Sequence, residues 1–200
     1  MPRPSVEEER RTQILDSACQ VIAQRGITEL RVADVARVAG LSPAIIHYYF
    51  DSKRELIKAA FAANFADSLE RRSGVLNSSA SPLVKLRSLI DSYVPEGEPT
   101  VRAWHVWIEL WAGALQDSDL QDLNEQAYGE WRRIVAQIIG EGQTNGEFLT
   151  GDPERLADVV VAALDGLSIQ SLAGQMPVER VRAVCSEMVD RLLLPAITSP

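Results

Sequence analysis

The 200-residue sequence predicts an all-α protein of about nine helices. Apolar residues recur every three or four positions through most of the chain, which is the spacing of a helix with one buried face. No stretch shows the strict alternation of apolar and polar residues that is typical of a strand. Polar segments rich in Gly, Pro and Ser separate the helical stretches, so the helices are expected to pack on one another around a shared core.

The first helix is expected to begin at Ser5 and to end at Gly26. Ser5 and Glu8 have the spacing of a capping box, in which each side chain bonds the backbone N–H of the other residue. The buried face would contain Ile14, Ala18, Val21 and Ile22. Arg10 and Arg11 on this helix are either solvated surface residues or contacts to phosphate.

Residues 31–58 predict two short helices joined by a tight turn, followed by the start of a longer helix. The apolar face of the first short helix contains Val32, Val35, Ala36 and Ala39. Gly40 follows this face, where helices commonly stop in a left-handed residue. Ser42 can cap the next helix, and Pro43 suits its first position because the missing N–H costs nothing there. This order is the helix-turn-helix plan, which presents its second helix to a DNA major groove.

The rest of the chain predicts six long helices separated by polar breaks. Ser52 and Glu55 form a second capping box, which opens a helix towards Arg72. Later helix starts are expected at Ser81–Pro82, at residue 101, at Ser118 with Gln121, at Asp152–Pro153 and at Pro177.

Composition and charge are those of an ordinary globular protein, with a net charge of -8 that argues against a general nucleic-acid binder. Residues 1–58 contain nine Lys and Arg against eight Asp and Glu, whereas residues 59–200 contain eleven against twenty. The acidic excess therefore lies outside the helix-turn-helix. Cys19 and Cys185 are widely separated among apolar neighbours, so we expect buried thiols in a reducing cytoplasm, with no disulfide and no metal site. No apolar run is long enough to cross a membrane.

Residues 10–58 resemble the tetracycline-repressor (TetR) family of bacterial transcriptional regulators. The matching positions are Ala33, Gly40, Leu41, Ser42, Tyr48, Tyr49, Phe50, Ser52, Lys53 and Leu56. The sequence departs from the usual pattern at Arg31, where Thr or Ser is common, and at His47, where Tyr is common. The resemblance implies a DNA-binding domain over residues 1–52 and an effector-binding and dimerisation domain over residues 53–200.

By this resemblance, the second short helix is the recognition helix. The residues expected at the DNA are Arg31, Ser42, Pro43, Ala44, Ile45, His47, Tyr48, Tyr49 and Lys53. Pro43, Ala44 and Ile45 offer only apolar contacts, such as with thymine methyl groups, so DNA shape is expected to supply part of the specificity. His47 either meets a base edge or packs beside the first helix. Of the two tyrosines, Tyr48 is expected to face DNA.

Four tryptophans lie in the second part of the chain, three of them on one helix face. They form either ordinary core or an aromatic pocket for an apolar ligand or an organic cation. The segments around them resemble the C-terminal domain of the betaine-regulator (BetI) type, which is associated with choline. The candidate ligand residues are Trp104, Trp107, Glu109, Trp111, Tyr128, Trp131 and Asp165. Asp165 must find a partner if buried, either as a counter-charge for the ligand or as a hydrogen-bonding group at an interface.

The last two helices have more apolar surface than one core face requires. In the resembled family these helices pair with their copies to form a four-helix dimer interface, and the alternative is a core within one chain. The candidate interface residues are Val161, Ala162, Ile169, Val181, Val184 and Met188.

Enzyme function is not expected. The two histidines lie in separate segments, and the chain has no Gly-rich phosphate loop, nucleophile elbow or metal-ligand cluster. No cofactor is expected either. The sequence predicts a cytoplasmic, homodimeric regulator, a repressor that binds a palindromic operator and is released by a small-molecule effector. The alternative is an adaptor that retains the helix-turn-helix for contacts with other proteins and does not bind DNA.

Overall fold

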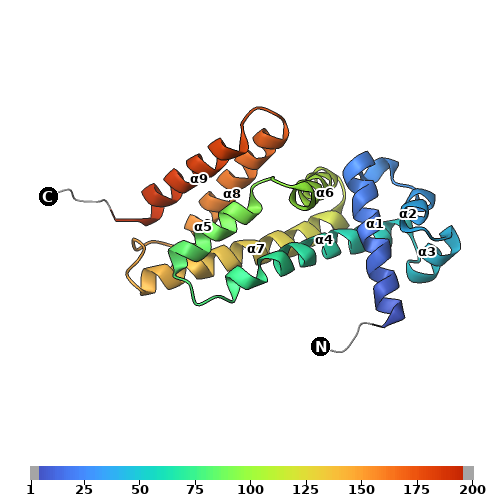
Figure 1. Cartoon of the computed structure of the whole chain (residues 1–200), viewed down its shortest axis with the longest axis horizontal. Helices are drawn as coiled ribbons and strands as arrows, with labels where there is room; N and C mark the ends of the chain where they lie inside the picture. Colours follow the sequence, from blue (N-terminus) through green and yellow to red (C-terminus); the bar gives the residue numbers. More distant parts are fainter. Residues whose placement is uncertain (1–4, 196–200) are drawn as a thin grey trace. The chain divides into compact units, whose positions relative to one another are not determined.

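A computed structural model describes residues 5–195, and this part of the chain contains nine α-helices and no strand. The predicted fold class is confirmed. The helices, labelled in Figure 1, are α1 (Val6–Glu29), α2 (Val32–Ala39), α3 (Pro43–Tyr49), α4 (Lys53–Leu76), α5 (Pro82–Tyr93), α6 (Glu98–Ala114), α7 (Ser118–Thr144), α8 (Pro153–Leu172) and α9 (Val178–Leu193).

The helices form two compact units. One unit contains the described residues up to Leu69 together with Val101–Ala127, and the other contains Glu70–Thr100 and the described residues from Tyr128 on. Packing therefore groups α6 with the helix-turn-helix, and both α4 and α7 contribute to each unit. The functional boundary between residues 52 and 53 stays a prediction.

The core of the first unit joins the helix-turn-helix to the first half of α4 and to α6. Its completely buried members include Ile14, Ile22, Leu30, Val35, Ile46, Phe50, Leu56, Ala60, Val106 and Leu110. Cys19 belongs to this core and donates its S–H to the carbonyl of Ala60 at 3.3 Å. Burial raises the pKa of the Cys19 thiol to about 12, so it stays protonated and unreactive.

The second unit contains α5, α8 and α9 with the greater part of α7. α8 and α9 pack along each other, and α5 also contacts α9 (Figure 1). Its buried side chains include Leu86, Leu89, Ile139, Val160, Leu164, Val181, Cys185, Val189 and Leu193. Within residues 5–195, no helix is both long and apolar enough to cross a bilayer.

Several helix ends follow the predicted caps, and two differ. The capping box of Ser5 and Glu8 is present. Ser42 precedes α3, but its side chain makes no capping hydrogen bond. Asp117, and not Ser118, caps α7, because its Oδ1 accepts the backbone N–H groups of Asp119 and Leu120 at 3.0 and 3.4 Å.

Candidate functional site

The turn between α2 and α3 has the geometry that holds a recognition helix at a fixed angle. Gly40 lies in the left-handed region at φ 66°. Its N–H reaches the carbonyl of Arg37 at 3.3 Å, and the N–H of Leu41 reaches that of Ala36 at 2.8 Å. These two bonds form a Schellman motif. Gln13 of α1 donates to the carbonyl of Ala39 at 2.7 Å, so α1 also fixes the end of α2.

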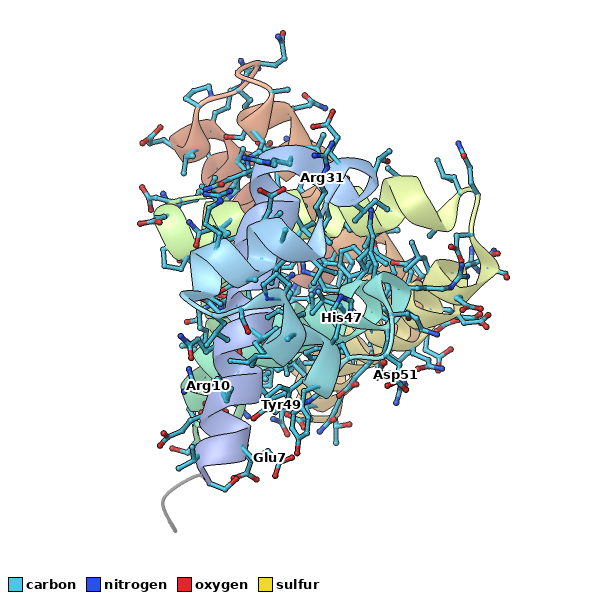
Figure 2. All side chains as sticks on the ribbon, turned by 90° about the vertical axis from the view of Figure 1, so that its right-hand side faces the viewer. Glu7, Arg10, Arg31, His47, Tyr49 and Asp51 are labelled. Carbon is cyan, nitrogen blue, oxygen red and sulfur yellow. The ribbon has the colours of Figure 1, made fainter. Side chains whose placement is uncertain are left out.

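Helix α3 buries one face and exposes the other. Ile46 and the adjoining Phe50 are each 1% exposed and pack into the core of the first unit. Pro43, Ala44, Ile45 and His47 are exposed, and Figure 2 labels His47 among the side chains of the helix-turn-helix. The exposed face contains the residues predicted to reach bases. Because His47 is exposed, it does not fill the alternative role of packing beside α1.

The two tyrosines at the end of α3 differ in exposure. Tyr48 is 78% exposed, while Tyr49 is half-buried against the core. Their rings meet edge to face with centroids 5.2 Å apart. Because Tyr49 packs against the core, its contact with Tyr48 helps to fix the orientation of the exposed Tyr48 ring.

Basic side chains around α3 are partly engaged within the protein. Lys53 donates to the carbonyl of Thr28 at 3.2 Å. The guanidinium of Arg11 lies over the Phe50 ring, 4.6 Å from its centroid. Arg31, at the start of α2, is exposed and makes no capping bond. Lys53 and Arg11 must therefore give up or share these contacts before they can bind phosphate.

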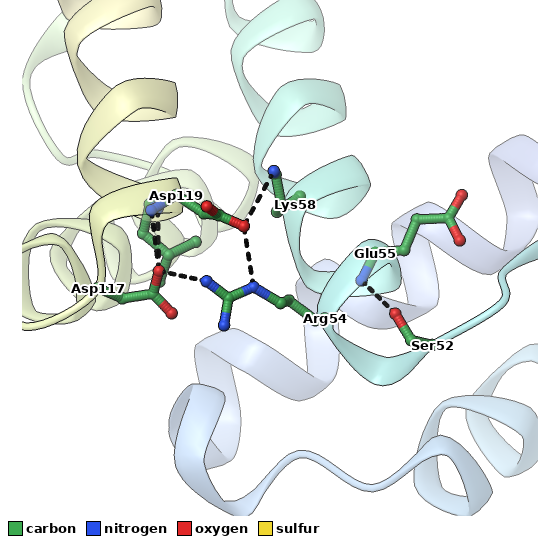
Figure 3. Close-up of polar contacts among 7 residues, drawn as sticks. Ser52, Arg54, Glu55, Lys58, Asp117 and Asp119 are labelled. Atoms are coloured by element: carbon green, nitrogen blue, oxygen red, sulfur yellow. Dashed lines mark hydrogen bonds and ion pairs between the residues drawn. The ribbon is translucent and has the colours of Figure 1, made fainter.

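A cluster of charges links the start of α4 to the start of α7 within the first unit (Figure 3). Arg54 donates to Asp117 at 2.7 Å and to Asp119 at 3.0 Å. Lys58 also contacts Asp119, at 3.5 Å. The Arg54 guanidinium lowers the pKa of Asp119. These charges are partly exposed, so the cluster fixes the geometry of α4 more than it adds stability.

Glu109 of α6 binds the bend in α1. Gly26 has φ 77° and interrupts α1, which continues to Glu29. The carboxylate of Glu109 accepts the N–H of Ile27 at 2.9 Å, next to this bend. The role of Glu109 in an effector pocket stays a prediction, and the structure shows that its carboxylate bonds the α1 backbone.

The three tryptophans of α6 pack with one another in the first unit. Trp104 is 3% exposed and meets Trp111 edge to face, with centroids 5.9 Å apart. Trp107 contacts Phe65 of α4 and Trp111 at centroid distances of 6.0 and 6.2 Å. Trp107 also packs against the core shared with the helix-turn-helix. These contacts fit the core alternative for this face of α6.

The second unit assembles a separate cluster of aromatic and polar groups around Asp165 of α8. The hydroxyl of Tyr93 from α5 donates to Asp165 Oδ1 at 2.9 Å. The hydroxyl of Tyr128 from α7 donates to Asp165 Oδ2. Trp131, one turn after Tyr128, stacks on the Tyr93 ring with centroids 5.3 Å apart and planes 9° from parallel. Of the predicted ligand residues, the structure thus brings Tyr128, Trp131 and Asp165 together.

Asp165 carries a charge that its surroundings do not neutralise. Its side chain is 8% exposed, and among the described residues it forms no ion pair with a Lys, Arg or His side chain. Burial raises its pKa to about 6, although the two tyrosine hydroxyls act in the opposite direction. At neutral pH the site therefore holds a desolvated carboxylate that is bonded to two tyrosine hydroxyls next to a stacked aromatic pair, which is a favourable environment for a cation.

Two further polar groups of the second unit are left without partners. The indole Nε1 of Trp131 and the hydroxyl of Ser168 are buried, and neither has a hydrogen-bond partner among the described residues. Ser168 lies one turn after Asp165 on α8 and is 0% exposed. Buried polar groups are rarely left unpaired, so these two groups suit a ligand that carries a hydroxyl or another polar group.

Arg72, near the end of α4, completes this cluster. Its guanidinium lies 5.3 Å from the Tyr93 ring centroid and 5.5 Å from that of Trp131. It also donates to the hydroxyl and the carbonyl of Ser92, at 3.0 and 3.1 Å. Neither Arg72 nor Tyr93 is among the ligand residues predicted from the sequence, because their meeting with Trp131 joins three helices that are distant in sequence.

The predicted interface residues divide by exposure. Val161 and Val181 are 1% and 0% exposed within the single chain, so they have no surface to offer a partner, and their assignment to the interface is corrected. Ala162, Ile169 and Val184 are exposed, and Met188 is half-buried. An exposed apolar set on α8 and α9 therefore remains, and Val159, 50% exposed, adds to it.

Comparison with known proteins defines the class of protein. Residues 14–60 match the family of bacterial regulatory proteins, tetR family, and residues 82–194 match the BetI-type transcriptional repressor, C-terminal. The HTH-type transcriptional regulator BetI of Proteus mirabilis (strain HI4320) is 28% identical over 201 residues, covering 96% of each chain. The HTH-type transcriptional regulator PksA of Bacillus subtilis (strain 168) is 25% identical and covers 96% of this chain and 94% of its own.

Solved structures agree with these relatives. A transcriptional regulator from Saccharomonospora viridis in complex with choline is 30% identical, with a TM-score of 0.87 over 94% of this chain and 98% of that one. The protein is a helix-turn-helix transcriptional regulator that binds DNA and responds to a ligand, and it is not an enzyme. The chain belongs to the TetR family, with a C-terminal domain of the BetI type.

Proposed function

We propose that the protein is a cytoplasmic, homodimeric repressor whose effector is a hydroxylated organic cation of the choline type. Two copies would pair through the exposed apolar residues of α8 and α9, so that two α3 helices meet half-sites about one DNA turn apart. The exposed face of α3 would contact base edges and phosphates, with Tyr48 as its most exposed aromatic group. The effector would bind in the second unit and lower the affinity of the dimer for its operator.

The observation that carries the effector proposal is the buried carboxylate of Asp165 beside the stacked rings of Tyr93 and Trp131. An ammonium group supplies the counter-charge that the carboxylate lacks, and aromatic faces attract cations. A hydroxyl on the same ligand offers a partner to Ser168 or Trp131. The choline complex of the Saccharomonospora viridis regulator supports this choice of ligand.

Calorimetric titration of the purified protein with choline tests the effector. We expect saturable binding that Asp165→Asn weakens at least about tenfold, because the buried counter-charge is lost. Asp91→Asn, a change of the same size at an exposed carboxylate on α5, should leave the affinity unchanged. The uncharged isostere 3,3-dimethylbutan-1-ol should bind far more weakly than choline. Equal affinity of choline for the wild type and Asp165→Asn would contradict the assignment of the site.

A further test addresses the adaptor alternative. This alternative arises because the helix-turn-helix segment has a charge close to neutral. A repressor binds operator DNA with an affinity that falls steeply as salt is raised, since counterions are released from the DNA. No retention on operator DNA at any salt concentration, from a folded protein, would favour an adaptor.

A further inference from the structure

Arg72 is an internal cation at the aromatic pair of the proposed effector site. We infer that Arg72 occupies the Tyr93–Trp131 pair in the effector-free protein, and that a cationic effector must displace it, which couples the effector to α4. This inference rests on the proposed function, because it specifies how the same site responds to its ligand.

The geometry places the guanidinium on the rings that an ammonium group would use. Arg72 lies about equally far from both ring centroids, at 5.3 and 5.5 Å, within the range of cation–π attraction. It is 5% exposed, and its two bonds to Ser92 hold it there. Burial lowers its pKa to about 10, so the guanidinium is still charged at neutral pH.

Arg72 and Asp165 approach Tyr93 through different groups. Asp165 accepts the hydroxyl of Tyr93, whereas Arg72 contacts the ring. No ion pair joins the two charges, and nearby charge does not offset the raised pKa of Asp165. A small cation that contacts both the rings and the carboxylate can therefore satisfy the site better than Arg72 does, and it would compete with Arg72 for the rings.

Because Arg72 belongs to α4, its displacement can affect the helix that follows the recognition helix. Arg72 lies in the last two turns of α4, a continuous helix that is separated from the recognition helix α3 by only three residues. Releasing Arg72 from Ser92, Tyr93 and Trp131 removes contacts between this end of α4 and the helices α5 and α7. Because α4 is one helix, a change at this end can reach the segment that follows α3.

Replacing Arg72 by Met separates binding from response. The Arg72→Met variant keeps a long apolar side chain but removes the competing charge. We expect it to bind choline about tenfold more tightly, while choline no longer lowers its affinity for operator DNA. Arg72→Lys, which keeps a cation, should retain the wild-type response, and Arg71→Met, a change at the exposed neighbour, should alter neither property. Unchanged or weaker choline binding by Arg72→Met, or undiminished release of its DNA, would overturn the inference.

A measurement on the wild type covers the case in which Arg72→Met does not fold. Ring currents of Tyr93 and Trp131 should shift the Arg72 guanidinium signal in protein labelled with ¹⁵N-arginine, and Arg72→Lys identifies that signal. Saturating choline should move the signal to the position of solvated arginines. If the wild type binds choline and the signal stays in place, the displacement is wrong while the effector proposal stands. If the wild type does not bind choline, the proposed effector itself fails.

Discussion

Asp165 is the residue whose chemistry distinguishes this molecule from a simple helical bundle. Its carboxyl pKa is raised from 3.8 to about 6 by burial. Between these two pH values the unfolded chain has released its proton and the folded protein has not, so rising pH favours unfolding. The contribution of Asp165 to stability is therefore greatest below about pH 4, and about 3 kcal/mol of it is lost by the time pH exceeds 6.

Thermal unfolding of the wild type and Asp165→Asn at several pH values tests this assignment. The wild type should lose stability relative to the variant as pH rises from 4 to 7, because only the wild type must bury a charge. Adding choline should raise the thermal stability of the wild type more at pH 7.5 than at pH 5. Parallel stability curves for the two proteins would show that Asp165 ionises normally.

The same titration predicts how effector affinity depends on pH. If choline binds the ionised carboxylate, its affinity should be nearly constant above about pH 6.5 and fall by up to about tenfold per unit below pH 6. Calorimetry from pH 5 to pH 8 measures this profile. In Asp165→Asn the profile should be flat, and a slope that persists in the variant would assign the titration to another group.

Gly26 is a second residue at which local geometry decides the outcome. Its φ of 77° strains any other residue, and an added Cβ would lie 2.8 Å from Oε2 of Glu109. We expect Gly26→Ala to destabilise the protein by about 1–3 kcal/mol, measured by chemical denaturation. Gly74→Ala, at a helical position of α4 with open space around it, should be neutral or stabilising. A neutral Gly26→Ala would mean that α1 can bend without its contact to Glu109.

At the scale of elements, the helices and their order were predictable because their signals are local. Apolar spacing and residues such as Ser5, Gly40 and Asp152 mark helices and their ends within a few positions in sequence. The predicted cap of α7, Ser118, lies one residue too late, because Asp117 and Ser118 are both good caps and only the structure shows which side chain bonds the backbone.

The candidate sites were only partly predictable, because their contacts join distant helices. Tyr93 and Tyr128 are 72 and 37 residues from Asp165, and no local pattern indicates that their hydroxyls meet it. The sequence offered the same Asp165 as a ligand or an interface residue, and the structure shows the two tyrosines that surround it. The bond from the Ile27 N–H to Glu109 joins residues 82 positions apart, so no local pattern indicates it either.

The pair of α8 and α9 leads to a prediction about assembly. Ile169 is 38% exposed on α8, two turns after the exposed Ala162, and a charge there should break a dimer formed through this surface. We expect Ile169→Glu to be monomeric at micromolar concentration by sedimentation, with an unchanged helical content, because an unpaired charge is costly at an apolar interface. Val84→Glu, at a 53% exposed apolar site on α5, is the matched control. A dimeric Ile169→Glu would place the interface elsewhere.

At the scale of the whole molecule, a DNA-binding helix-turn-helix and an aromatic, carboxylate-containing site occur in one chain joined by α4. The acidic excess lies outside residues 1–58, so the segment that meets DNA is not repelled by its own charge. Regulation requires that effector and operator bind different states of the protein, and that each lowers the affinity of the other by the same factor.

The most direct test of this account is fluorescence anisotropy of operator DNA, taken from the region flanking the gene, titrated with the protein in the presence and absence of choline. The wild type should bind at modest salt and lose at least about fivefold in affinity when choline is saturating. Tyr48→Ala should lose about tenfold in DNA affinity without choline. Asp165→Asn should bind DNA as the wild type does, and the same choline concentration should lower its DNA affinity much less. Operator binding by the wild type that choline does not change, although choline is bound, would contradict the account.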